Sequence, residues 1–108
     1  MLELDVSREF TKNVVVYGPD GEVQGDFDAT FVTVPVDIAT SPENKSKRMV
    51  DLCVKSVNEE QLKLKGADGE YLKGADLLAG VCNDRAISSA LLRVYEDVVG
   101  KKNLQPTL

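Results

Sequence analysis

The stretch Glu22–Thr30 reads EVQGDFDAT, and it decides the fold. Its even positions carry acids, an amide or a hydroxyl, whereas its odd positions carry apolar residues or glycine, and Phe31 continues the apolar set. This period of two is typical of a β-strand that turns one face to a core and the other to water. The stretch therefore predicts a strand with an acidic solvent face.

The residues before this strand complete an antiparallel hairpin. A second strand candidate begins at Phe10 and is strongest in the β-branched run Val14–Tyr17. The segment Gly18–Gly21, which contains Pro-Asp-Gly, separates the two runs and is typical of a tight turn.

The acidic strand is expected to continue to about Val34. Its apolar residues move from odd to even positions at Phe31–Val32, which predicts a β-bulge or a strand end. Pro35 indicates that the continuation has left the ladder or lies at a sheet edge. The apolar residues of this continuation, which we call the valine edge, are Val32, Val34, Val36 and Ile38.

Two main helices are expected after the sheet. Ser41-Pro42-Glu43 combines a capping hydroxyl, a proline at the first helical position and an acid in the first turn, and it predicts a helix to about Lys55. The last helix is predicted from a cap at Asn83 to Gly100, with apolar residues at helical spacing. Between the two lies a short helix over Ala75–Ala79 that the following glycine ends.

The predicted fold class is therefore α+β: an N-terminal antiparallel β-sheet (hairpin) followed by two main α-helices with a short helix between. Residues 1–100 are expected to form a single domain, and residues 101–108 a flexible C-terminal tail, because the tail lacks periodicity. Over residues 58–72, Leu62 and Leu64 alternate with Lys63 and Lys65. This stretch predicts either a small second hairpin or a surface loop with two anchors.

Composition and charge argue against several classes of function. The 108 residues carry a net charge of −5 and no histidine. The first 40 residues hold eight acids against two bases, so this part opposes contact with nucleic acid. The missing histidine removes Ser-His and Cys-His nucleophiles and the commonest zinc ligand. Cys53 and Cys82 are interpreted as buried, reduced side chains.

Membrane insertion is not expected either. No apolar run reaches the roughly 18–20 residues of a membrane span. The N-terminus has no basic region typical of a signal peptide, so we expect a cytoplasmic protein.

Two carboxylate patterns could carry chemistry, but neither matches its site fully. Asp20–Asp26 places oxygens as in a calcium-binding EF-hand loop, yet Phe31 stands where the bidentate glutamate is required. Asp26 and Asp28 share a strand face, so a small hydrolase built on them is a third interpretation of the chain. No metal or cofactor is expected, and the protein is predicted not to be an enzyme.

Two apolar surfaces suit the binding of a partner. One is the valine edge, which could accept a partner strand if it borders the sheet. The other is the ridge of the last helix, where Tyr95 offers an aromatic anchor. A solvated strand face and simple packing of the helix on the sheet are the structural alternatives. The candidate residues of the helix ridge are Ile87, Leu91, Val94, Tyr95 and Val98.

The order of these parts resembles the tail assembly chaperones of long-tailed (siphovirus) phages. The matching parts are a valine-rich strand, a Pro-Asp-Gly turn, a strand like Asp26–Phe31, a helix and a loop with Asp68-Gly69. A Leu-Leu segment at Leu77-Leu78 follows, and a final helix runs from Arg85-Ala86-Ile87 through Ala90-Leu91 to Tyr95 and ends in Gly100–Asn103. The likeness covers nearly the whole chain. It departs at Val57–Glu60, where the family often has an apolar, aromatic segment.

The resemblance implies a non-enzymatic chaperone that binds and solubilises the tape measure protein in the host cytoplasm. It implies self-association in curved arrays. It also implies a longer form, made by a programmed frameshift, whose extension recruits the tail-tube protein. Lys101 and Lys102 are the candidate frameshift region, and the alternative is an ordinary basic helix end that suits the helix dipole. The rival interpretation is a small virion component, a tail-tube or head–tail joining protein that forms rings.

Overall fold

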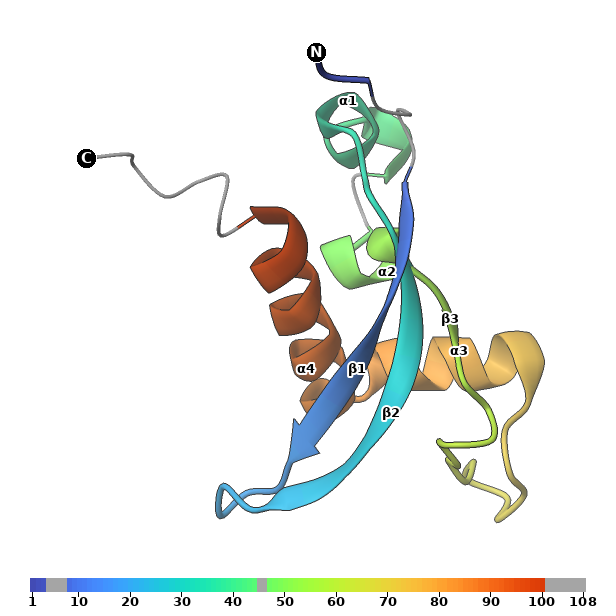
Figure 1. The fold of residues 1–108 in the computed structure, drawn as a ribbon. Coiled ribbons are helices and arrows are strands. Elements are labelled where there is room, and N and C mark those ends of the chain that lie inside the picture. The colour runs from blue at the N-terminus through green and yellow to red at the C-terminus, as the bar shows by residue number, and fades with distance from the viewer. Residues whose placement is uncertain (4–7, 45–46, 101–108) are drawn as a thin grey trace.

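The computed structural model describes residues 1–3, 8–44 and 47–100, and it confirms the predicted α+β class (Figure 1). A three-stranded antiparallel sheet precedes the longer helices. The strands are β1 (Glu9–Tyr17), β2 (Val23–Val32) and β3 (Val54–Val57). The α-helices are α1 (Val36–Ala39), α2 (Met49–Cys53), α3 (Gly74–Asn83) and α4 (Arg85–Tyr95). The 3₁₀ turn η1 covers Pro42–Asn44, and the π-helical turn η2 covers Glu96–Gly100.

The predicted hairpin is present and forms most of the sheet. Strands β1 and β2 pair antiparallel along their whole length, with Asn13 opposite Asp28. The turn closes through a 2.7 Å hydrogen bond from the Gly18 N–H to the Glu22 carbonyl. Gly21 adopts a φ of 85°, a left-handed conformation that a side chain would strain. The Pro-Asp-Gly segment therefore forms the predicted turn, and its glycine adopts the left-handed conformation that the turn requires.

The alternation in β2 sends its aromatic residues into the core. Phe27, Ala29 and Phe31 are at most 2% exposed. The Phe31 ring stacks on Phe10 with centroids 5.2 Å apart, and Tyr95 of α4 joins them at 6.3 Å from each ring. These contacts join the first strand, the second strand and the last long helix in one core.

Helices α3 and α4 meet at a corner and supply the helical side of the core (Figure 1). The corner is Asp84, whose carboxylate accepts a 3.0 Å hydrogen bond from the Ile87 N–H and so caps α4. Asn83, the predicted cap, is instead the last residue of α3. The two helices are thus separated by one residue.

The predicted helix from Ser41 to Lys55 is wrong in its extent. Among its described residues, 41–44 and 47–55, the helical elements are the turn η1 and the short helix α2, and Val54 is already extended. The reason is tertiary: Val54–Val57 pairs with β2, and the Asn58 N–H donates to the Asp28 carbonyl at 2.9 Å. β-branched residues suit that pairing better than they suit a helix.

The predicted short helix and the predicted valine edge also differ from the structure. Helix α3 continues through Gly80 to Asn83, so it is nearly as long as α4. Strand β2 ends at Val32 and is the central strand of the sheet, not an edge. After Pro35 the chain turns into α1, because the Pro35 carbonyl accepts hydrogen bonds from two following amides. The register shift between β2 and β3 lies at Thr30/Phe31, next to the predicted bulge.

Candidate functional site

The segment of residues 62–73, which we call the lysine arm, is the most distinctive surface feature. Lys65 pairs with Tyr71 in one antiparallel bridge, and the Leu72 N–H donates to the Leu64 carbonyl at 2.8 Å. A turn closes the arm, with Gly69 at a φ of 84°. Two structures were predicted for this stretch, a small second hairpin and a surface loop with two anchors. The arm forms the hairpin, with a single bridge.

The leucine side of the arm faces α3. Leu62, Leu64 and Leu72 are half-buried and pack against the core. A Cβ at Gly80 would lie 2.8 Å from Leu72 Cδ1 and 3.1 Å from Leu64 Cδ2. Gly80 therefore allows the arm to approach α3 closely, and it lies within the helix, which continues to Asn83.

The opposite side of the arm carries an exposed aromatic ring among lysines. Tyr71 is 51% exposed, and the Nζ atoms of Lys63 and Lys65 lie 5.5 and 5.4 Å from its ring centroid. Both distances fall within the range of a cation–π contact. Lys63 and Lys65 thus lie over the same tyrosine ring, and Lys73 lines the same hollow as Lys63 and Tyr71. We call Lys63, Lys65, Tyr71 and Lys73 the lysine face.

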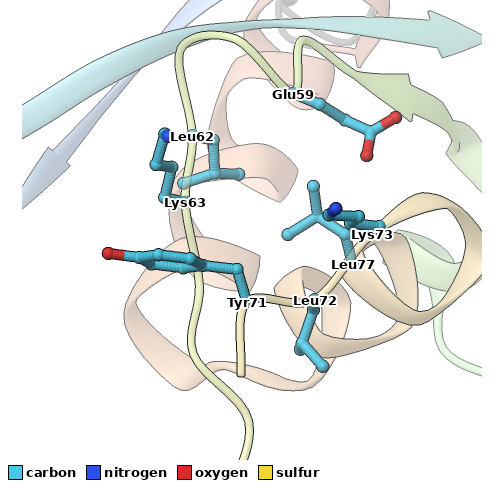
Figure 2. A pocket seen from close by; sticks show the side chains of 7 residues that line it. All are labelled: Glu59, Leu62, Lys63, Tyr71, Leu72, Lys73 and Leu77. Atoms are coloured by element: carbon cyan, nitrogen blue, oxygen red, sulfur yellow. The ribbon is translucent and has the colours of Figure 1, made fainter. Parts of the chain in front are cut away.

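A hollow of about 340 Å³ opens beside this face (Figure 2). Leu77, which is 1% exposed, belongs to the core and also lines the hollow. Figure 2 shows Tyr71 flat along one side, with Glu59 and Lys73 on the other. The Glu59 carboxylate accepts a 2.9 Å hydrogen bond from the Gly74 N–H at the start of α3. The lining residues are Glu59, Leu62, Lys63, Tyr71, Leu72, Lys73 and Leu77.

A second hollow of about 290 Å³ adjoins the first. The two share Leu62 and Lys63, and the second extends to Gly25 and Asp26 of β2. Its apolar lining includes Ile87 of α4, which is 8% exposed. Together the two hollows offer apolar surface on both sides of the Leu62-Lys63 peptide.

The lysines of this site have no acidic partner in direct contact. The ion pairs among the described residues join Arg48 to Asp51 and Lys55 to Glu9. Lys63, Lys65 and Lys73 belong to neither pair. Positive charge therefore collects around an exposed tyrosine in a protein whose net charge is −5.

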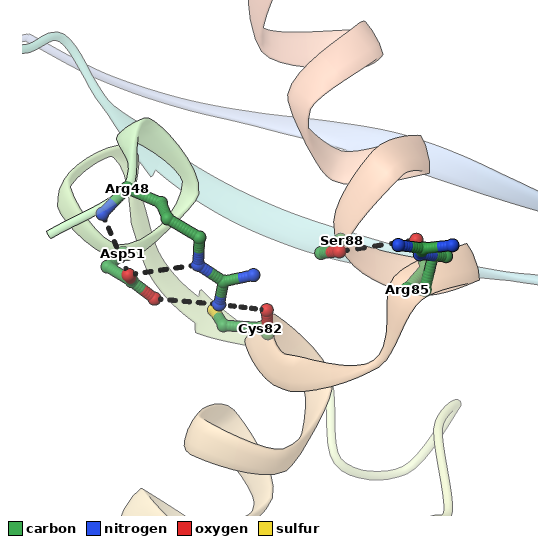
Figure 3. Close-up of polar contacts among 5 residues, drawn as sticks. All are labelled: Arg48, Asp51, Cys82, Arg85 and Ser88. Carbon is green, nitrogen blue, oxygen red and sulfur yellow. Dashed lines mark hydrogen bonds and ion pairs between the residues drawn. The ribbon is translucent and has the colours of Figure 1, made fainter.

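A second polar cluster ties α2 to the end of α3 (Figure 3). The Arg48 guanidinium bonds the Asp51 carboxylate at 3.3 Å and donates to the Cys82 carbonyl at 2.5 Å. Partial burial tends to raise the pKa of Asp51, but hydrogen bonds from the Arg48 side chain and backbone outweigh it and lower the pKa. The cluster satisfies a carbonyl at a helix end, so its role is structural.

The cysteines are free and buried, as predicted. Burial raises the pKa of the Cys53 thiol to about 12, and burial also raises the pKa of Cys82. A thiol that stays protonated at neutral pH is a poor nucleophile and a poor metal ligand. Both cysteines therefore serve as small core residues.

The predicted helix ridge is occupied by the protein's own sheet. Ile87, Leu91 and Tyr95 are at most 8% exposed, and the Tyr95 hydroxyl accepts a 3.0 Å hydrogen bond from the Val34 N–H. Val94 is half-buried, while Val98 is 37% exposed. Packing on the sheet, the structural alternative, accounts for the buried part of the ridge.

The valine edge is divided between two environments. Val32 closes β2 and Val34 packs on the core, whereas Val36 and Ile38 are 79% and 45% exposed on α1. The structure brings Val34 to Tyr95 and leaves Val36 and Ile38 on the surface. Lys101 and Lys102 lie outside the described residues.

The predicted carboxylate patterns lie in and after the hairpin turn. Asp26 and Asp28 both accept hydrogen bonds from the Asn13 amide, at 2.9 and 3.3 Å. Over residues 1–3, 8–44 and 47–100, no group of three acidic or cysteine side chains is placed to hold a metal ion. In the same part of the chain, every helix is too short or too polar to cross a bilayer.

Sequence analysis assigned no binding role to Lys63, Lys65, Tyr71 and Lys73. The signal was present, because lysine alternates with leucine on one side of the turn and Tyr71 and Lys73 flank Leu72 on the other. The alternation alone does not specify which residues pair across the turn, and so it does not predict which side chains come together.

Comparison of the chain with protein-family models, with curated proteins and with solved structures finds no match.

Proposed function

We propose that this protein is a non-enzymatic chaperone of phage tail assembly, which binds the tape measure protein and keeps it soluble. The assignment to tail assembly rests on the order of sequence segments, from the valine-rich strand through the Asp68-Gly69 loop to the last helix. The confirmed hairpin and the helical second half agree with that order.

The observation that carries the binding function is the hollow beside Tyr71. Leu62, Leu72 and Leu77 give it an apolar lining, and the exposed ring of Tyr71 forms one wall. Aromatic anchors beside apolar hollows are typical of surfaces that hold a segment of another polypeptide. We place the partner surface here and not on the helix ridge, because Ile87, Leu91 and Tyr95 are already buried.

The other expected properties belong to the same proposal. They are self-association into curved arrays, action in the host cytoplasm, and a frameshifted longer form that recruits the tail-tube protein. The rival proposal is a virion component that forms rings. The finished particle distinguishes the two proposals, because a chaperone is absent from it and a virion component remains in it.

The test is co-expression with the tape measure protein encoded by the same genome. We expect the tape measure protein to stay in the supernatant only when this protein is present, and to elute with it in gel filtration. Mass spectrometry of purified particles completes the test. A tape measure protein that precipitates regardless, or particles that contain this chain, would contradict the proposal.

A further inference from the structure

We propose that the lysine face binds an acidic segment of the partner, one that carries an apolar side chain between its carboxylates. The inference rests on the proposed function in that it specifies the chemistry of the partner segment. The face consists of Lys63, Lys65, Tyr71 and Lys73, together with the hollow beside them.

Charge gives the first argument. Lys63 and Lys65 lie about the same distance from one tyrosine ring, and neither meets a carboxylate in the described structure. Lys73 lines the same hollow as Lys63 and Tyr71. Gathering like charges is unfavourable unless a counter-charge arrives, so a segment with carboxylates would gain from all three lysines. Glu59, the acid in the hollow, is already bonded to the Gly74 N–H.

The apolar lining gives the second argument. Leu62, Leu72 and Leu77 leave a hollow of about 340 Å³, which is large enough for one or two apolar side chains. The acidic hairpin would repel a long phosphate chain, which argues against nucleic acid as the occupant. A polypeptide with both carboxylates and an apolar side chain fits both features.

The acidic hairpin of a second copy of this chain fits less well. Its acidic face is already used within the hairpin, because Asp26 and Asp28 share the Asn13 amide and the Glu22 carboxylate accepts from Gln24. The buried side chain between those two aspartates is Phe27, which is 2% exposed. The hairpin therefore cannot offer an apolar side chain between its carboxylates without unfolding.

The experiment measures the binding of a fluorescein-labelled peptide of alternating glutamate and leucine by anisotropy. Two control peptides replace glutamate by lysine, or leucine by serine. The test variant is Lys63→Gln, Lys65→Gln and Lys73→Gln together. The matched control is Lys12→Gln, Lys47→Gln and Lys55→Gln, which changes the net charge equally. Tyr71→Ala and Tyr71→Phe test the ring.

We expect the arm variant to bind the acidic peptide about tenfold more weakly, because each of three rim ion pairs contributes modestly. The matched control should stay within about twofold. Tyr71→Ala should weaken binding and Tyr71→Phe should retain it, and both control peptides should bind more weakly than the probe. Equal loss in both lysine variants would overturn the inference, because it would indicate only general charge attraction.

Two further outcomes overturn the choice of occupant. Tighter binding of a single-stranded DNA oligonucleotide than of the acidic peptide would assign the face to nucleic acid. A change of oligomeric state confined to the arm variant, measured by sedimentation, would assign it to a second copy.

The solubility test separates this inference from the proposed function. If the arm variant keeps the tape measure protein soluble as well as the unmodified protein does, the function stands and the site is wrong. If the unmodified protein binds the peptide through the arm but never solubilises the tape measure protein, the site stands and the function is wrong.

Discussion

Strand β2 and the lysine arm both alternate apolar and polar residues, yet they use the alternation differently. In β2 the apolar residues Phe27 and Phe31 are fully buried, and the strand is paired along its whole length. In the arm the leucines are only half-buried, and a single bridge joins Lys65 to Tyr71. The period of two selects a face in both cases, whereas burial and pairing depend on what lies against that face.

The solvent faces of the two regions differ as well. On the hairpin, polar side chains bind one another: the Thr11 and Thr30 hydroxyls are 3.0 Å apart, and Asn13 bonds two aspartates. On the arm, Lys63 and Lys65 lie over Tyr71, and neither belongs to an ion pair within the part of the chain that the structure describes. The polar side chains of the hairpin therefore bind one another, whereas the lysines of the arm stay available for the acidic segment that we propose as their ligand.

The largest expected effect tests the core under the hairpin. Phe31→Ala removes a ring that is 0% exposed and stacked on Phe10, so we expect unfolding to become easier by about 3–5 kcal/mol. Urea denaturation followed by circular dichroism measures it. Val23→Ala is the control, because Val23 lies on β2 but is 61% exposed, and it should change stability by less than about 0.5 kcal/mol. Similar losses in the two variants would show that β2 has no buried face.

Alkaline pH should weaken the core near β2 through Cys53. Its pKa is raised by burial from 9.0 to about 12, so the unfolded chain loses this proton first. The stabilising contribution is complete below pH 9 and is lost as the pH rises from 9 toward 12. We expect a loss of about 1 kcal/mol between pH 7 and 10.

Cys53→Ala is the comparison for this pH dependence. The variant is less stable at neutral pH because it leaves a small cavity. It should nevertheless lose less stability than the unmodified protein between pH 7 and 10, in urea titrations at both pH values. An identical loss in both proteins would mean that Cys53 does not cause it.

A smaller effect is expected when the hydrogen bonds among polar side chains on the solvent face of the hairpin are removed. Asn13→Ala removes the amide shared by Asp26 and Asp28 and leaves two neighbouring carboxylates, so we expect a loss of about 0.5–1 kcal/mol. Lys63→Ala on the arm should change stability by less than about 0.5 kcal/mol. Thermal unfolding of both variants measures the contrast, and a larger loss for Lys63→Ala would reverse our assignment of the two faces.

The hairpin and the helices α3 and α4 were predictable because the sequence patterns that indicate them are local. The Gly18–Gly21 turn, the alternation in β2 and the apolar spacing of the last helix each lie within a few residues of the structure they encode. The end of the helix predicted to about Lys55 was wrong because Val54–Val57 could be helix or strand, and pairing with β2 decides between them.

The candidate site was less predictable than the fold. Tyr71 lies beside Lys63 and Lys65 because the arm folds back on itself at one bridge, which no local signal specifies. The same holds for Gly80, whose sequence position indicated a helix end. Its actual role depends on leucines eight and sixteen positions earlier in the chain, which only the packed structure brings to it.

The smallest global effect, and the most local one, is expected from Gly80→Ala. Alanine favours the helix by about 1 kcal/mol, but its Cβ would meet the Leu72 and Leu64 methyl groups at 2.8 and 3.1 Å. Because both are side-chain ends, the arm can shift away, so the two terms oppose each other and overall stability should change by less than about 1 kcal/mol. The arm should loosen instead, with faster hydrogen exchange at the Leu72 and Gly66 amides, which are bonded within the arm.

The exchange experiment also has an internal control. In the Leu72→Ala background the nearer methyl group is gone, so Gly80→Ala should then accelerate exchange less than it does alone. Amides of β2 such as Phe27 should exchange at an unchanged rate in every variant. If Gly80→Ala instead accelerated exchange equally in β2 and the arm, the two regions would unfold as one unit, and the arm would owe its order to the same core as the hairpin.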